Sequence, residues 1–140
     1  MSSTVRSGTP VPSIATAAWL PFIGRVGIAA IFLISGVSKV TAPAYNIAYI
    51  ESAGLPFAPL ALAGAAFVEI VGGALLVLGY RTRIAAGVLA LFALATAIFF
   101  HAHLADQNQF IHFFKNIAMA GGLLQVVAFG AGGFSLDARR

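Results

Sequence analysis

The sequence predicts an all-α membrane protein whose four transmembrane helices form an antiparallel bundle. Of its 140 residues, 60% are hydrophobic and 9% are charged, with a mean hydropathy of +0.96. Soluble domains are about 45–50% apolar and about 25% charged. Eight Lys or Arg and four Asp or Glu are too few to cover a water-exposed surface. A lipid bilayer is therefore the expected surrounding, and long apolar runs should cross it.

The elements follow in order along the chain. Residues 1–18 are rich in Ser, Thr and Pro and lack the apolar core of a signal peptide, so we expect a disordered tail. Residues 19–133 should form one transmembrane domain, and residues 134–140 a polar C-terminal tail. Each apolar run is close to the ~20 residues that cross a ~30 Å hydrocarbon core. The expected spans cover residues 21–40, 58–79, 83–103 and 110–130.

The connections between spans are short. Residues 44–53 mix aromatic and polar side chains and are too short to span, which is typical of an interfacial helix. Gly54 and Pro56 end that segment. A basic turn over 79–83 and a polar stretch over 106–109 join the later spans. Short connections force neighbouring helices to run antiparallel.

The distribution of Lys and Arg predicts the orientation. With four spans, both chain ends and the 79–83 turn share one side of the membrane. That side carries Arg6, Arg25, Arg81, Arg83, Arg139 and Arg140, whereas the other side carries Lys39 and Lys115. The positive-inside rule predicts that both termini lie in the cytoplasm.

Composition and motifs exclude several functions. The chain has no cysteine, which excludes its own dithiol catalysis, cysteine-ligated iron–sulfur clusters and disulfides. Its basic residues sit at the ends of apolar runs, so nucleic-acid binding is not expected. We find no serine triad, phosphate loop, dinucleotide fingerprint or H-E-x-x-H motif, and so no self-contained catalytic motif.

Glu69 is the most informative position. It interrupts the second span about 10 residues from the cytoplasmic end, near the middle of the membrane. A carboxylate there is costly unless it is paired, hydrogen-bonded or protonated. Arg25 is the candidate partner. Two interpretations remain open: a buried pair that fixes packing, and a carboxyl that accepts protons or binds a ligand. Its helical face also carries the small residues Ala65, Ala66, Gly72 and Gly73.

A second polar cluster is predicted near the outer side. Its candidate ligand-binding residues are Lys39, His101, His112, Lys115 and Asn116. His112 lies three and four residues before Lys115 and Asn116, so the three share a helical face. His101 and His112 at similar depth are weak candidates for binding a metal or haem iron, although no ligand motif supports this. Nearby Phe residues suggest a slot for a quinone. The alternative is an ordinary polar cap with lipid-facing aromatics.

These residues carry a resemblance to the DoxX family, which covers about Gly24 to Asp137. The matching segments, in order, are Gly24-Arg25, residues 31–39, 53–56, 68–73 and 78–83, His101 or His103, Lys115-Asn116-Ile117, residues 121–124, Gly130-x-Gly132 and Ser135-Leu136-Asp137. The resemblance implies a four-helix protein of the bacterial inner (plasma) membrane. It also implies a redox association, since some relatives are subunits of a thiosulfate–quinone oxidoreductase or partners in an oxidative-stress complex.

The leading functional hypothesis is a redox-associated accessory subunit that binds a quinone-like or other apolar ligand within the bundle. Such a protein would be a membrane subunit of an oxidoreductase, with a soluble or membrane redox partner and the capacity to form homo-oligomers. The alternatives are a non-enzymatic scaffold that anchors a partner and a small transporter that uses Glu69. Quinone and haem are the candidate cofactors, and no sequence motif identifies either.

Overall fold

The structure, a computed structural model, describes residues 17–140, so the tail predicted over 1–18 lies almost wholly outside the described residues. Within residues 17–140 the chain is all-helical and has no strand. The elements are α1 (Trp19–Thr41), α2 (Pro43–Ser52), α3 (Ala58–Leu78), α4 (Thr82–Phe100), α5 (Gln107–Phe129) and the 3-10 helix η2 (Asp137–Arg139). In this range α1, α3, α4 and α5 are long and apolar enough to cross a membrane, which confirms the predicted four-span fold.

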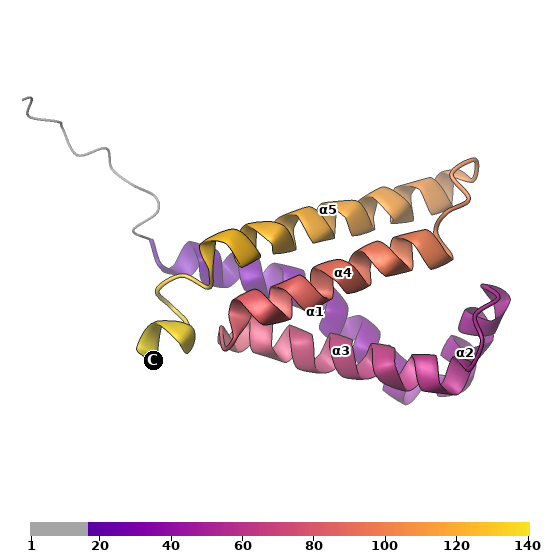
Figure 1. The fold of residues 1–140 in the computed structure, drawn as a ribbon, viewed down its shortest axis with the longest axis horizontal. Helices are drawn as coiled ribbons and strands as arrows, with labels where there is room; N and C mark the ends of the chain where they lie inside the picture. The colour runs from indigo at the N-terminus through magenta and orange to yellow at the C-terminus, as the bar shows by residue number, and fades with distance from the viewer. Residues whose placement is uncertain (1–16) are drawn as a thin grey trace, which may run out of the picture.

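The four long helices run antiparallel in chain order, as two closely packed pairs (Figure 1). Helix α1 packs along α3, and α4 packs along α5, while α3 and α4 join the two pairs. At one end of the bundle lie the start of α1, the α3–α4 turn and the C-terminal segment 130–140. We call this the closed end. At the other end lie α2 and the α4–α5 connection, and we call it the cavity end.

Local sequence signals set the helix boundaries. Pro43 and Pro59 stand in the first turns of α2 and α3, where a missing N–H costs nothing. Gly79 ends α3 in the left-handed conformation with φ 68°, a conformation that glycine adopts without strain. The Asp106 carboxylate accepts the N–H groups of Asn108 and Gln109. This cap lets α5 begin at Gln107, three residues before the predicted start of the fourth span.

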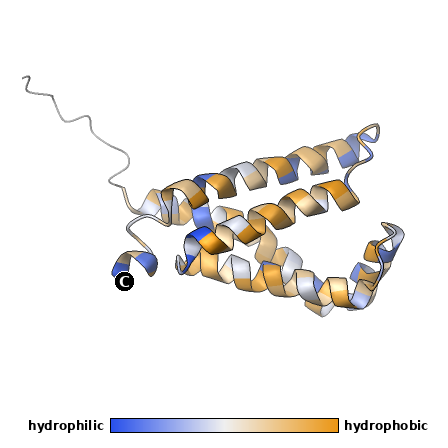
Figure 2. Cartoon of the chain, viewed as in Figure 1, coloured by the Kyte–Doolittle hydropathy of each residue, from blue (hydrophilic) through white to orange (hydrophobic). Residues whose placement is uncertain are grey.

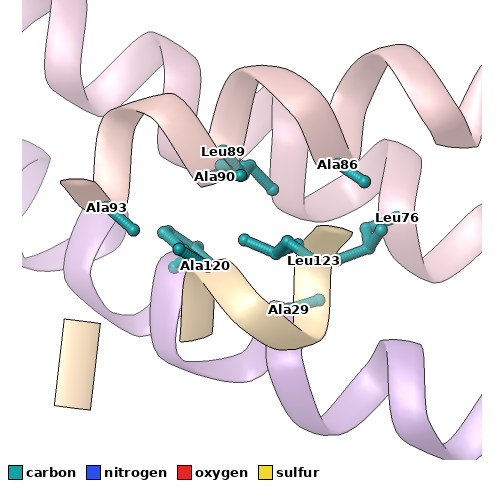
Figure 3. Packing of buried hydrophobic residues seen from close by; sticks show 9 residues of the cluster. Ala29, Leu76, Ala86, Leu89, Ala90, Ala93, Ala120 and Leu123 are labelled. Carbon is teal, nitrogen blue, oxygen red and sulfur yellow. The ribbon is translucent and has the colours of Figure 1, made fainter. Parts of the chain in front are cut away.

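The core is built largely from small residues. Ala86, Leu89, Ala90 and Ala93 of α4 lie with Ala120 and Leu123 of α5 in one buried cluster (Figure 3), which Leu76 of α3 and Ala29 and Phe32 of α1 complete. Alanine lets helix backbones approach closely, which matters where lipid removes the hydrophobic driving force between helices. A smaller cluster of Ile50, Ala58 and Leu62 holds α2 against α3.

The outer surface of the bundle is apolar. Large side chains on all four long helices face outward, among them Ile34, Leu60, Leu91 and Phe129. Figure 2 shows the same helices as mainly hydrophobic, with hydrophilic residues at the C-terminal segment and in the α4–α5 connection. A contiguous surface of this kind requires lipid rather than water as its solvent.

Candidate functional site

A cavity of about 460 Å³ lies at the cavity end, bounded by all five α-helices. Helix α2 forms part of its wall, and the ring of Tyr49 stacks on Phe100 of α4 at 5.3 Å. Burial and the neighbouring Tyr45 raise the pKa of Tyr49, so its phenol stays neutral. The lining is mainly apolar with a few polar groups, which is the usual composition of a ligand site. The polar and charged lining residues are Ser35, Lys39, Asn46, Glu69, Thr96, His101, Lys115 and Asn116.

A buried ion pair lines this cavity. The Lys39 ammonium lies 3.0 Å from Glu69 Oε2 and 3.2 Å from Oε1, and it donates to Ser35 Oγ at 2.8 Å. The Ser35 hydroxyl in turn donates to Glu69 Oε1 at 3.0 Å. Glu69 is 4% exposed and the Lys39 side chain 16%. The carboxylate therefore has three donor contacts in a site where an unpaired charge would be costly.

Helix geometry explains why this pair forms. Side chains in an α-helix lean toward the N-terminus of their own helix. Because α1 and α3 are antiparallel, Lys39 leans toward the middle of the bundle and Glu69 leans toward the cavity end. Gly36 lets the two helices meet at this level, since a Cβ there would lie 2.6 Å from Ile70 Cγ1 and 3.2 Å from Glu69 Cβ.

The expectation that Arg25 pairs with Glu69 is wrong. Arg25, 1% exposed, lies at the closed end and donates to four backbone carbonyls, those of Leu76, Val77, Ala131 and Phe134. The first two are among the last carbonyls of α3, which have no partner inside their own helix. A cation there also complements the negative end of the helix dipole. Arg25 is therefore a structural tie between α1, α3 and the C-terminal segment.

The C-terminal segment, expected as a simple polar tail, is bound to the α3–α4 turn. The Asp137 carboxylate accepts the backbone N–H of Arg81 and of Thr82, each at 2.9 Å, and the Thr82 hydroxyl at 2.6 Å. It thus caps the first turn of α4 from a distant part of the chain. The hydrogen bonds from Thr82, followed by that from Arg81, lower the pKa of Asp137 although partial burial opposes them.

The two histidines at the rim of the cavity come together, but not as ligands. His101 and His112 stack with ring centroids 5.1 Å apart and planes inclined by 26°. His101 Nδ1 contacts Gln109 Oε1 at 3.3 Å, and His112 Nδ1 contacts the Lys115 ammonium at 3.0 Å. Burial, together with the nearby His112 and Lys115, lowers the pKa of His101 despite the Gln109 bond, so this ring is neutral at neutral pH.

This arrangement does not fit haem or a metal ion. Axial ligands hold iron between two nitrogen atoms, whereas these rings face one another across their planes, with one nitrogen of each already bonded. Residues 17–140 contain no group of three or more His, Asp or Glu side chains arranged to bind a metal ion. The polar cluster at the rim is therefore better suited to hydrogen bonding than to coordination.

Asn116 occupies the inner wall of the cavity. It is 7% exposed, and its amide nitrogen donates to Thr96 Oγ1 of α4 at 3.0 Å. The predicted set of seven residues therefore divides in two. Five line the cavity, namely Lys39, Glu69, His101, Lys115 and Asn116, and His112 stacks on His101 beside it, whereas Arg25 lies at the closed end. Sequence reasoning missed Ser35 and Thr96; the four-residue spacing of Ser35 and Lys39 was a usable signal.

Comparison with known proteins gives one consistent result. The model of the DoxX family matches residues 20–102. Inner membrane protein YqjF of Escherichia coli (strain K12) is 32% identical over 117 residues, which cover 82% of this chain and 87% of the relative. Inner membrane protein YphA of the same organism is 33% identical over 126 residues, covering 86% and 89%. No solved structure matches the chain.

Proposed function

The chain belongs to the DoxX family and is an integral inner membrane protein, and from this premise we propose that its cavity binds a flat, amphipathic ring molecule of the quinone type. In this role the protein is an accessory subunit of a membrane redox system. The observation that carries the proposal is the cavity of about 460 Å³ with a buried Lys39–Glu69 pair in its wall. Ligand sites of small ring molecules have volumes of about 300–1,000 Å³.

The wall chemistry supports an amphipathic ring. Phe32, Phe92, Phe99 and Phe100 supply flat apolar surface around the cavity, and Tyr45 and Tyr49 of α2 add aromatic surface at the rim. Hydrogen-bonding groups are few and separated by apolar ones, which suits a ring that carries oxygen atoms at its edge. The apolar chain of such a molecule would remain in the surrounding lipid.

We place the cavity end toward the outer face of the membrane. The closed end carries Arg81, Arg83, Arg139 and Arg140, whereas Lys39 and Lys115 belong to the cavity end. Positive charge favours the cytoplasmic side. A ligand would then enter from the outer leaflet, and the chain, which has no cysteine, would rely on a partner for any thiol chemistry.

Quinone binding provides the test. Purified protein in lipid nanodiscs is titrated with decylubiquinone by thermophoresis, with empty nanodiscs subtracted, and extracted lipids are analysed by mass spectrometry. We expect saturable binding that weakens about tenfold or more in the double variant Lys39→Met/Glu69→Gln, because the charged Lys39 donor that a quinone carbonyl would accept is lost. Gln125→Leu is the control, since Gln125 is exposed on α5 and does not line the cavity.

If the purified protein retained no quinone and showed no saturable binding, this proposal would be overturned and the anchoring alternative favoured. A transporter would need a polar path through to the closed end. There the Arg25 network instead ties α1, α3 and the C-terminal segment together.

A further inference from the structure

We infer that the inner wall of the cavity selects a ligand that donates hydrogen bonds, such as an aromatic hydroxyl, over the matching compound that can only accept them. This inference rests on the proposed function and specifies the chemical class of its ligand. It depends on which donors and acceptors of the buried wall are already used by the protein, and on which remain free.

The buried cation is largely used by the protein itself. An ammonium group carries three N–H donors. Lys39 makes three contacts shorter than 3.3 Å, one to Ser35 Oγ and two to the Glu69 carboxylate. The Ser35 hydroxyl proton is likewise used, in its bond to Glu69 Oε1. The two oxygens of one carboxylate lie too close together to take separate N–H bonds from a tetrahedral ammonium, so one N–H of Lys39 remains for a ligand. A hydroxyl and a carbonyl oxygen accept it alike, so Lys39 does not discriminate between the two ligand classes.

The Glu69 carboxylate can only accept hydrogen bonds from a ligand. Its two oxygen atoms have about four acceptor sites, and Ser35 and Lys39 occupy three of them. The carboxylate lines the cavity, so its remaining site is available to a hydroxyl group. A carbonyl oxygen placed there would face another partially negative oxygen without a proton between them.

Asn116 adds a second acceptor, and its orientation is fixed by its neighbour. The Thr96 hydroxyl donates to the carbonyl of Ala93 at 2.9 Å, so its oxygen is left to accept. The group that faces Thr96 must then be the amide NH₂ of Asn116, which agrees with the 3.0 Å contact between Asn116 Nδ2 and Thr96 Oγ1. The amide oxygen consequently points away from Thr96, and a flipped amide would place two acceptors together.

The Asn116 amide oxygen is free and accessible. It has no hydrogen-bond partner among residues 17–140. In the same range, every fully buried side-chain nitrogen or oxygen has a hydrogen-bond partner, so this unpartnered oxygen is not fully buried. Since Asn116 is 7% exposed and lines the cavity, its amide oxygen is reached from the cavity. A buried acceptor of this kind is best satisfied by a ligand hydroxyl.

The other polar lining residues lie outside the inner wall. The Asn46 amide donates to the carbonyls of Ser38 and Ala42, and His101 contacts Gln109. Tyr45 and Tyr49 are exposed, and their hydroxyls both donate and accept, so they do not discriminate between the two ligand classes. Lys115, also exposed, has spare N–H groups and would hold an oxygen at the outer edge of a ring. Selection therefore depends on the two acceptors of the inner wall, the Glu69 carboxylate and the Asn116 amide oxygen.

A matched pair of ligands tests this selection without redox chemistry. 2-Naphthol and 2-methoxynaphthalene share a flat apolar ring, but only the first has a donor. Each is titrated against the full chain in nanodiscs, with empty nanodiscs subtracted to remove partition into lipid. We expect 2-naphthol to bind at least about tenfold more tightly, because a site that hydrogen-bonds a hydroxyl disfavours analogues that lack it.

Variants identify the group responsible. Asn116→Leu should reduce the preference to about twofold, and Thr96→Val should reduce it partly by freeing the amide to rotate. Gln125→Leu should leave the preference unchanged. Equal, saturable binding of both ligands to the unmodified protein would overturn this inference alone. Binding of neither ligand would overturn it together with the proposed cavity function. A preference that survives Asn116→Leu with the fold intact would also contradict the role given to Asn116.

Discussion

The closed end and the cavity end each bury a charged group to almost the same degree, yet the two groups have different kinds of partner. Arg25 is 1% exposed and is held by four backbone carbonyls. Glu69 is 4% exposed and is held by two side chains, Lys39 and Ser35, beside a cavity. Backbone carbonyls neither titrate nor change rotamer, whereas side chains do both.

Burial of a charge in a membrane bundle is therefore a poor guide to function by itself. A charge whose hydrogen bonds all end on backbone holds helices together. A charge that shares a side-chain network with an adjacent cavity is able to exchange partners with a ligand. The distinction gives the two ends different expected responses to mutation, in stability at one end and in binding at the other.

Removing the Arg25 guanidinium should have the largest effect on stability. In Arg25→Met the carbonyls of Leu76, Val77, Ala131 and Phe134 lose their donor at once. We expect a loss of about 5 kcal/mol, because hydrogen bonds to a charged group contribute about 1.5–3 kcal/mol each and their effects are not additive. The midpoint of SDS unfolding, followed by circular dichroism, measures the loss.

Arg25→Lys is the matched control, since it keeps the charge but not the planar fork of donors. It should recover only part of the lost stability. If Arg25→Met folded with unchanged stability, the assignment of Arg25 as the tie of the closed end would be wrong.

The Lys39–Glu69 pair should give a smaller loss that a second substitution relieves. Lys39→Met leaves Glu69 buried without its cation, for which we expect about 3 kcal/mol of destabilisation. Lys39→Met/Glu69→Gln removes both charges and should restore most of the stability while ligand binding stays impaired. The same SDS titration, run on both single variants and the double variant, forms the mutant cycle. Additive losses would show that the pair makes no coupled contribution.

The smallest effect is expected at Asp137, and it should depend on pH. Hydrogen bonds from Thr82 and Arg81 lower the pKa of this carboxyl in the folded state. Its contribution is therefore complete above the unfolded-state pKa of about 4 and is lost as the pH falls through the folded-state value. At pH 7 Asp137→Asn should cost about 1 kcal/mol, as for other helix caps. The difference between the two proteins should shrink in unfolding titrations near pH 3, and a constant difference would contradict this account.

Composition and periodicity predict much of the fold, because a bilayer leaves few alternatives for apolar runs of this length. The four helices and their antiparallel order can be predicted directly from the apolar runs and short connections. The exact residues at which the helices begin and end are predicted less well. Asp106 lengthens α5 at its start through a side-chain cap, and α4 ends at Phe100, which leaves His101 outside the helix.

The site was predictable in its members but not in its pairing. Glu69 and the outer polar cluster were recognisable as polar residues in apolar runs. Their partners were not, because pairing depends on the relative shift of α1 and α3. That shift is set where Gly36 lies against Ile70, and it brings Lys39 to Glu69 rather than Arg25, which lies about four helical turns away on α1.

The Arg25 tie has a consequence for biosynthesis. Its acceptor at Ala131 lies 106 residues later in the chain. At a synthesis rate of about 5–20 residues per second, roughly 5–20 s separate the emergence of the guanidinium from that of this acceptor. During that interval lipid phosphates or water must solvate Arg25 at the membrane surface. Assembly of the bundle is thus complete only when translation reaches the final segment, which covers the ends of α1 and α3 made long before it.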